Sequence, residues 1–324
     1  MSIVMVPKSP FDLMTKFILL FEMVLVIYSS PLLVESAEVI DFNNKTVNIN
    51  SSNRIVSLNG SNTEILFALG VGDRVVGCDL SSTYPPKVKE LPNIGYQYRL
   101  NAEGILALKP DLVIGRKDAK PPQVISQLRA AGVSVLLLEE PRTFGSAKSR
   151  IKTIGQAVDK VGRSNELINL LQKDLLALQS KLENLKASEK KKGLFMYLRG
   201  PQTALVLGKK TGPGAMLELS GAINCSGKIE NSQPMTAEAV VAAKPDVLVL
   251  FESGLKSIGG IEGLLKLPGL AQTPAGRNQR VVSIDGLYLS GFGVRSGRAA
   301  LELFQAIYET KGFHAIQFVA ESED

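Results

Sequence analysis

The chain has 324 residues, of which 45% are hydrophobic and 21% are charged, a composition typical of globular proteins. That length is enough for two lobes, each with a hydrophobic core of its own. The net charge is +6, but lysine and arginine do not gather with aromatic residues in any dense patch, so we expect no nucleic-acid partner.

The first 37 residues have the pattern of a secretory signal peptide. Two lysines precede an apolar stretch at residues 17–34, which Glu22 interrupts, and small residues follow at Ser36 and Ala37. A basic start, an apolar centre and a small-residue end are the three parts of such a signal. An uncleaved anchor helix is the alternative, but the stretch is short for a membrane span and Glu22 is costly there. We therefore expect residues 1–37 to be removed on export.

Residues 38–162 alternate between strand and helix patterns. The predicted strands cover 54–58, 75–77, 112–114 and 133–138, and the predicted helices cover 64–69, 101–109, 122–131 and 145–161. A capping box is expected at Ser61 and Glu64, in which each side chain bonds the backbone of the other residue. Strands and helices in alternation build a parallel sheet covered by helices. We predict an N-terminal α/β lobe over these residues.

A leucine stripe predicts one long helix in the middle of the chain. The leucines recur at intervals of three and four, at Leu167, Leu171, Leu175, Leu178, Leu182 and Leu185. This spacing places them on one face of a helix. A coiled-coil seam would show a similar stripe, but we favour a helix packed on a globular core. We expect the helix, in residues 163–192, to join two lobes.

The α/β pattern restarts in residues 193–324. The predicted strands cover 193–198, 204–207, 247–251 and 281–284, and the predicted helices cover 214–220, 236–243 and 296–310. The segment AEGILALKPD at 102–111 matches AEAVVAAKPD at 237–246, and each copy reads as helix, proline break and strand. The predicted fold class is therefore α/β, with two Rossmann-like lobes built on central parallel-type sheets and joined by one long backbone helix.

Catalytic motifs are scarce in this sequence. The only histidine is His314, near the end of the chain, so there is no Ser–His or Cys–His pair to place in a site. The chain also lacks a phosphate-binding loop of the P-loop type. Ligands favour the crevice between two lobes. We therefore expect an exported ligand-binding protein and not an enzyme.

The loop IGYQYR at residues 94–99 carries the most distinctive side chains. It places Tyr96, Tyr98 and Arg99 directly before a helix that Asn101 is expected to cap. Phenolate oxygen is a known ligand of haem iron, and a nearby arginine favours the phenolate by lowering the tyrosine pKa. Ordinary loop tyrosines, half-buried on the lobe surface, are the alternative interpretation.

Several motifs together make the sequence resemble the haem-binding periplasmic proteins of haem ABC importers. These belong to a wider helical-backbone family that also binds cobalamin and siderophores. The resemblance covers residues 53–312. Its motifs are RIVSL from Arg54 with Thr63-Glu64, LPNIGY from Leu91, LNAEGIL from Leu100, MLELSGA from Met216 and GFGVR from Gly291. The Gly-Tyr loop before the Ala-Glu-Gly helix is the part most specific to haem.

The resemblance implies roles for the tyrosine loop. Tyr96 would be the axial ligand of the haem iron. Relatives often carry an arginine two positions after that tyrosine, whereas here Tyr98 occupies the position and Arg99 follows it. Either residue is thus a candidate partner of the phenolate, or an alternative ligand.

Four further residues receive roles from the resemblance. Arg199 and Arg295 are candidate contacts of the haem propionates, because carboxylates in a cleft need cations. Glu64 and Glu218, one on each lobe, are candidate docking residues for arginines of the membrane permease. For Glu64, the predicted capping box is an alternative explanation of why a carboxylate occupies this position.

The function that the resemblance implies is periplasmic capture of haem. The protein would hold b-type haem as its transported ligand and deliver it to an inner-membrane ABC permease with its ATPase. An outer-membrane haem receptor system is a further candidate partner. Cobalamin or a ferric siderophore is the alternative ligand, since proteins of the same fold bind them.

Overall fold

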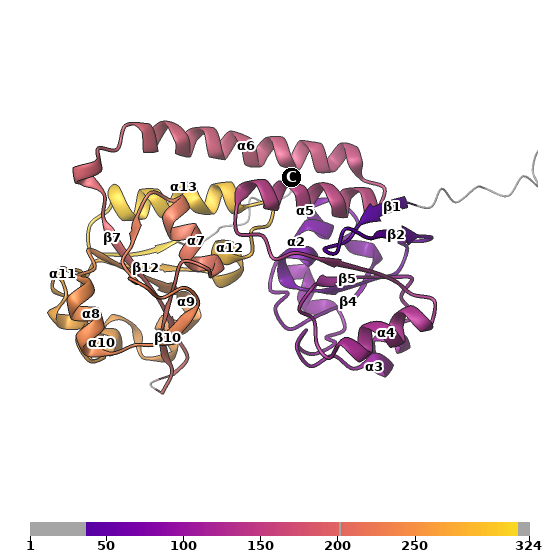
Figure 1. The fold of residues 1–324 in the computed structure, drawn as a ribbon, viewed down its shortest axis with the longest axis horizontal. Coiled ribbons are helices and arrows are strands. Elements are labelled where there is room, and N and C mark those ends of the chain that lie inside the picture. Colours follow the sequence, from indigo (N-terminus) through magenta and orange to yellow (C-terminus); the bar gives the residue numbers. More distant parts are fainter. Residues whose placement is uncertain (1–36, 201, 317–324) are drawn as a thin grey trace, which may run out of the picture. The chain divides into compact units, whose positions relative to one another are not determined.

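The computed structural model describes residues 37–200 and 202–316 (Figure 1). The predicted signal peptide therefore lies outside the described residues, except for Ala37. Within the described ranges, no helix has both the length and the hydrophobicity needed to cross a membrane. The described residues belong to one compact unit, in which two sheets define two lobes.

The N-terminal lobe is built on a four-stranded parallel sheet in the order β4-β3-β5-β6 (Figure 1). Its strands are β3 (Ile55–Leu58), β4 (Val75–Cys78), β5 (Leu112–Arg116) and β6 (Ser134–Leu138). Its helices are α2 (Gly60–Ala68), α3 (Ala102–Ala107), α4 (Pro122–Ala130) and α5 (Phe144–Ala157), with short 3-10 helices at Gly72–Arg74 and Pro86–Glu90. An antiparallel hairpin, β1 (Ala37–Ile40) and β2 (Thr46–Ile49), precedes them.

Both faces of this sheet are covered. Ile55 and Leu112 pack in one hydrophobic cluster with α2 and α5, whereas Val56 and Val113 pack in a second cluster with α3 and α4. Successive side chains of a strand point to opposite faces, so a strand that is apolar throughout feeds two cores. This explains the continuous apolar runs in the sequence.

The C-terminal lobe is built on a seven-stranded sheet in the order β10-β8-β7-β11-β12-β13, with β9 paired to β7. Its strands are β7 (Lys192–Leu198), β8 (Ala204–Leu207), β9 (Ile223–Asn224), β10 (Ser232–Pro234), β11 (Val247–Phe251), β12 (Val281–Ile284) and β13 (Phe313–Ile316). Its helices are α7 (Gly212–Leu219), α8 (Ala237–Ala243), α9 (Glu252–Ser257), α10 (Gly260–Leu265), α11 (Pro274–Arg277), α12 (Gly286–Ser290) and α13 (Ser296–Tyr308), with 3-10 helices at Ala187–Glu189 and Leu270–Gln272. The pairs β7–β11, β11–β12 and β12–β13 are parallel, whereas β8 runs antiparallel to β7.

The repeated segment occupies equivalent places in the two lobes. Asn101 caps α3 by accepting from the N–H of Gly104 at 3.0 Å, and Thr236 caps α8 in the same way. Each helix is followed by a lysine with positive φ, Lys109 at 49° and Lys244 at 46°, because helix is disfavoured directly before proline. The strands that follow, β5 and β11, each lie beside the first parallel strand of the lobe. The predicted shared plan is confirmed.

Helix α6 (Val161–Glu183) packs on both lobes (Figure 1). Leu167 and Leu171 belong to a hydrophobic cluster of the N-terminal lobe, and Leu178 belongs to one of the C-terminal lobe. The helix is shorter than predicted, since it ends at Glu183 and not near Lys192. Lys192 instead opens β7, and its N–H donates to the Asp246 carboxylate at 2.8 Å.

The junction between α5 and α6 also differs from the prediction. Helix α5 ends at Ala157, and Gly162 lies inside the first turn of α6 instead of ending the previous helix. Gly155 provides the close contact there, because a Cβ at this position would lie 2.5 Å from the Cβ of Ser164. The two helices therefore pack closely at a small residue.

Replacing Gly155 with alanine is expected to lower the free energy of unfolding by about 1–3 kcal/mol, the usual cost of overpacking. The matched control is Gly162→Ala, because an added Cβ there meets no atom within 4 Å. The control should leave stability unchanged or raise it by up to ~1 kcal/mol through helix propensity. Urea unfolding measures both variants, and equal effects would contradict the packing argument.

Candidate functional site

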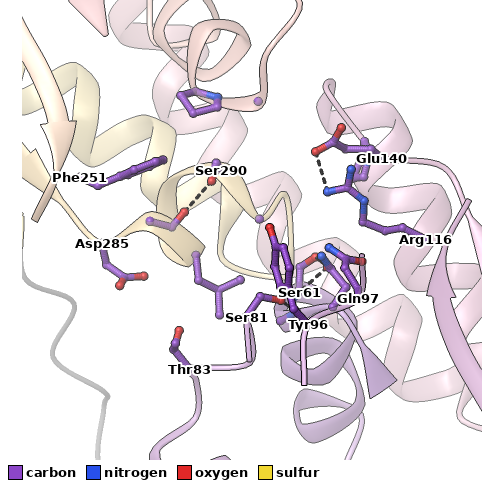
Figure 2. A pocket seen from close by; sticks show the side chains of 18 of the residues that line it. Ser61, Ser81, Thr83, Tyr96, Gln97, Arg116, Glu140, Phe251, Asp285 and Ser290 are labelled. Atoms are coloured by element: carbon purple, nitrogen blue, oxygen red, sulfur yellow. Dashed lines mark hydrogen bonds and ion pairs between the residues drawn. The ribbon is translucent and has the colours of Figure 1, made fainter. Parts of the chain in front are cut away.

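A cavity of about 520 Å³ lies between the lobes, within the size range of small-molecule sites. Both lobes line it, as Figure 2 shows. The lining from the first lobe includes Asn59, Ser61, Ser81, Thr83, Tyr96, Gln97, Tyr98, Arg116, Glu140 and Arg150, and that from the second includes Gly212, Pro213, Phe251, Ser253, Asp285, Leu287 and Ser290.

The cavity sits at the carboxyl ends of the parallel strands of both sheets. Asn59 directly follows β3 and Arg116 ends β5, while Phe251 ends β11 and Asp285 follows β12. Ligands bind at this edge in open α/β sheets, where loops and helix starts meet. The helices α2, α7 and α12 all begin at the cavity.

Tyr96 presents a free phenol to the cavity. Its side chain is 45% exposed, and Figure 2 shows its hydroxyl directed toward the space between Ser290 and the Arg116–Glu140 pair. The loop is held by its backbone: Gly95 has a φ of 87°, and the N–H of Arg99 donates to the carbonyl of Tyr96 at 2.7 Å. No described residue makes a hydrogen bond to the Tyr96 hydroxyl, so that oxygen is available to a ligand.

Tyr98 is chemically different from its neighbour. The two rings meet edge to face at 5.0 Å, but the Tyr98 hydroxyl donates to Asp118 at 3.0 Å. Burial raises the pKa of Tyr98 to about 12, and the Asp118 carboxylate adds to the increase while Arg116 opposes it. Tyr98 is therefore a protonated hydrogen-bond donor at neutral pH.

A charged network supports the two tyrosines. Arg116 bonds Asp118 at 2.7 Å on one side and Glu140 at 2.9 Å on the other. The arginine holds the pKa of Asp118 below its usual value, against the effect of burial, which is the largest single influence. Asp118 therefore stays ionised as the acceptor of the Tyr98 proton.

The Tyr98–Asp118 bond predicts a pH dependence of stability. The pKa of Tyr98 is about 12 in the folded protein and about 10 when unfolded. The contribution of the protonated Tyr98 to folding stability is therefore complete below pH ~10 and is lost as the pH rises toward ~12. Tyr98→Phe should thus be less stable than wild type at pH 9, and the difference should shrink by pH 11.5. Urea unfolding of both proteins across this pH range tests the prediction. A difference in stability that does not change with pH would contradict the assignment of the proton to the Tyr98 hydroxyl.

The three predicted arginines lie outside the lining of the cavity. Arg99 and Arg199 are exposed on the surface, and neither is among the described residues that line the cavity. Arg295 also lies outside the lining. Its guanidinium bonds both oxygens of Glu64, with Nε to Oε1 at 2.8 Å and Nη2 to Oε2 at 2.9 Å. It also stacks 3.8 Å from the ring centre of Tyr84. The charge of Arg295 is thus already compensated within the protein.

The capping box predicted at Ser61 and Glu64 is wrong. Helix α2 begins at Gly60, and Asn59 is the cap, since its side chain accepts from the N–H of Ser61 at 3.1 Å. Asparagine is a strong cap in its own right, so the helix starts directly after β3 and about one turn earlier than predicted. Glu64 consequently lies inside the helix.

The two predicted docking carboxylates lie in contrasting surroundings. Glu64 is only 3% exposed and joins the two lobes through Arg295. In this conformation it presents no free oxygen to a partner protein. Glu218 is exposed on α7, where a partner can reach it.

Most of the cavity lining was not named as site residues from the sequence, and Arg150 is the buried cation among these residues. Arg150 lies on α5, is 5% exposed and lines the cavity. Its Nη2 donates to the carbonyls of Gly291 at 2.5 Å and Phe292 at 2.7 Å, in the other lobe. A single arginine in an amphipathic helix is usually solvated, so only its position among Ala147, Ile151 and Ile154 indicated a buried face.

Comparison with known proteins assigns the fold to a family. Residues 55–287 match the model of the periplasmic binding protein family. The chain belongs to this family. A curated relative, the uncharacterised ABC transporter substrate-binding lipoprotein YvrC of Bacillus subtilis, is 31% identical over 271 residues, which cover 83% of this chain and 84% of YvrC. A vitamin B12-binding protein of Vibrio cholerae is 25% identical over 205 residues, covering 62% of this chain and 71% of that protein.

Solved structures that match this periplasmic binding protein include several haem-binding proteins. RhuT of Roseiflexus sp. RS-1 is 44% identical with a TM-score of 0.76, over 80% of this chain and 99% of RhuT. BhuT in complex with two haems is 36% identical with a TM-score of 0.76, over 80% of this chain and 99% of BhuT. HutB of Vibrio cholerae is 33% identical with a TM-score of 0.72, over 80% of this chain and 100% of HutB. The resemblance and the α/β fold class predicted from the sequence are confirmed, and these relatives are binding proteins rather than enzymes.

Proposed function

We propose that this periplasmic binding protein captures haem in the cleft between its lobes, with Tyr96 as the axial ligand of the iron. The observation that carries the proposal is the position of the Tyr96 hydroxyl, which lies in the cavity without a hydrogen bond to any described residue. The haem-binding relatives, at 33–44% identity, support the choice of ligand.

The chemistry of the cavity suits a ferric porphyrin. Ferric iron prefers an anionic oxygen, and phenolate ligation of haem is known in proteins. Phe251, Leu287 and Pro213 supply apolar surface for the faces of the ring. Because Tyr98 is held protonated by Asp118, it serves as a second-sphere donor and not as a competing ligand.

Delivery to a membrane transporter completes the proposed function. The relation to an ABC transporter substrate-binding protein supports an inner-membrane permease with its ATPase as the partner. The exposed Glu218 is the favoured docking carboxylate, and Glu64 could take part only if its pair with Arg295 opened. Residues 1–37 would direct export to the periplasm, with 38–162 and 193–324 as the two lobes of the mature protein.

A haemin titration of the purified mature protein tests the proposal. The expected result is a ferric phenolate spectrum that saturates with haemin, while cyanocobalamin and a ferric siderophore bind far more weakly. Cobalamin is the competing ligand, because the vitamin B12-binding relatives share this family. Tight cobalamin binding without a haemin spectrum would overturn the assignment to haem.

A further inference from the structure

Arg150 is a buried cation whose hydrogen-bond partners are incomplete. Its side chain is 5% exposed and lines the cavity between the lobes. Within residues 37–200 and 202–316, its partners are two neutral acceptors, the carbonyls of Gly291 and Phe292, and its Nε has no partner. A guanidinium has five N–H donors, so Arg150 retains unused donor capacity.

No carboxylate of the described residues bonds Arg150. Glu64 and Glu140 influence its charge, but Glu64 gives both oxygens to Arg295 and Glu140 bonds Arg116. The other acidic residue of the lining, Asp285, accepts the N–H of Tyr288 at 2.8 Å as the cap of α12. Burial lowers the pKa of Arg150 to about 9, against the opposing effect of the Glu64 and Glu140 carboxylates. A buried charge without a counter-ion is costly.

The surroundings of Arg150 also favour an anion. The N-terminus of α2, with the Ser61 hydroxyl, and the N-terminus of α7 at Gly212 both open on the same cavity. Helix N-termini carry partial positive charge, which favours a nearby anion. The other arginine of the lining, Arg116, is already neutralised by Asp118 and Glu140. Among the described residues that line the cavity, Arg150 is thus the arginine without a carboxylate bonded to it.

We propose that Arg150 binds a carboxylate of the ligand inside the cleft. For haem, whose assignment rests on the function proposed above, this group is a propionate. The interaction completes the hydrogen bonds of Arg150 and supplies its missing counter-charge. Arg150 would then select ligands with an acidic edge, in place of the role predicted for Arg199 and Arg295.

Esterified haemin tests this proposal, because the dimethyl ester keeps the porphyrin and iron but removes the propionate charges. Wild-type protein should bind haemin about 10- to 100-fold more tightly than the dimethyl ester, as expected for one charge-assisted contact. In Arg150→Met the ratio should fall close to one, with the phenolate spectrum retained. Arg150→Lys should restore part of the ratio.

Two further variants make the result decisive. Arg150→Gln keeps an NH₂ donor for the two carbonyls but has no charge, so it decides the question if the methionine variant does not fold. Arg277→Met is the matched control: Arg277 also donates to a backbone carbonyl, that of Gln272, but lies exposed on α11. The ratio of haemin affinity to dimethyl ester affinity in Arg277→Met should equal that of wild type.

The outcomes separate the two proposals. If uncharged variants of Arg150 still prefer haemin over its ester as strongly as wild type does, the carboxylate is bound elsewhere and the inference is wrong. If wild-type protein binds neither porphyrin, the proposed haem function itself fails. A wild-type protein that binds both porphyrins equally keeps the haem function but overturns the role of Arg150.

Discussion

Replacing Tyr96 with phenylalanine is expected to lower haemin affinity about 100-fold or more and to remove the phenolate-to-iron charge-transfer band. Such a loss corresponds to about 2.7 kcal/mol of binding free energy. The change removes one oxygen and leaves the ring, so the shape of the cleft is kept. Residual binding should persist, because burial of the porphyrin faces against Phe251 and Leu287 does not depend on the iron ligand.

Tyr98→Phe is the matched control for this experiment. It removes the same atom from the same loop, only two residues away, but from a phenol that donates to Asp118. It should keep the charge-transfer band and lose affinity by less than about tenfold, the effect of one second-sphere hydrogen bond. If Tyr98→Phe loses the charge-transfer band and Tyr96→Phe keeps it, Tyr98 is the iron ligand and the assignment of Tyr96 is wrong.

Breaking the Glu64–Arg295 pair is expected to cost about 3–5 kcal/mol of unfolding free energy, the largest effect of any change outside the ligand site. The pair is bidentate and buried, with side chains 3% and 12% exposed. Arg295→Met would leave the Glu64 carboxylate buried without its cation. Removing both charges in Glu64→Gln with Arg295→Met should recover much of the loss, because neither partner then remains as a buried charge that has lost its ion pair.

An exposed ion pair provides the comparison. Lys210 and Glu230 also meet at 2.7 Å, but their side chains are 58% and 62% exposed. Lys210→Met should therefore change stability by only about 0–1 kcal/mol. Urea unfolding of both single variants and the double variant gives the result. If Arg295→Met costs no more than Lys210→Met, the buried pair does not hold the lobes together.

Much of the fold was predictable because it depends on local chemistry. The strand at Ala204–Leu207 was predicted with the bounds observed, and the caps Asn101 and Thr236 behave as expected. The repeat at 102–111 and 237–246 correctly indicated two lobes of one plan. Caps, proline breaks and apolar runs act over a few residues, so a sequence displays them directly.

The site was less predictable because its contacts are distant in sequence. Glu64 and Arg295 are 231 positions apart, and no local pattern joins them. The resemblance singled out Tyr96, but no local pattern distinguished it from Tyr98, since the difference in their hydrogen bonds comes from Asp118, 20 positions after Tyr98. Arg150 resembles any surface arginine until α5 is placed against the other lobe. Long-range pairing, and not propensity, decides the chemistry of this cleft.

The location of the cleft at the strand ends has a consequence for how this protein could diversify. Tyr96 and Asp285 lie in loops next to the element ends, while the hydrophobic clusters lie behind them in the sheets and helices. Mutations can therefore exchange side chains that line the cavity with little effect on the cores. A single scaffold can in this way acquire new cargo by small steps, which accounts for haem-binding and vitamin B12-binding proteins among the relatives of one chain.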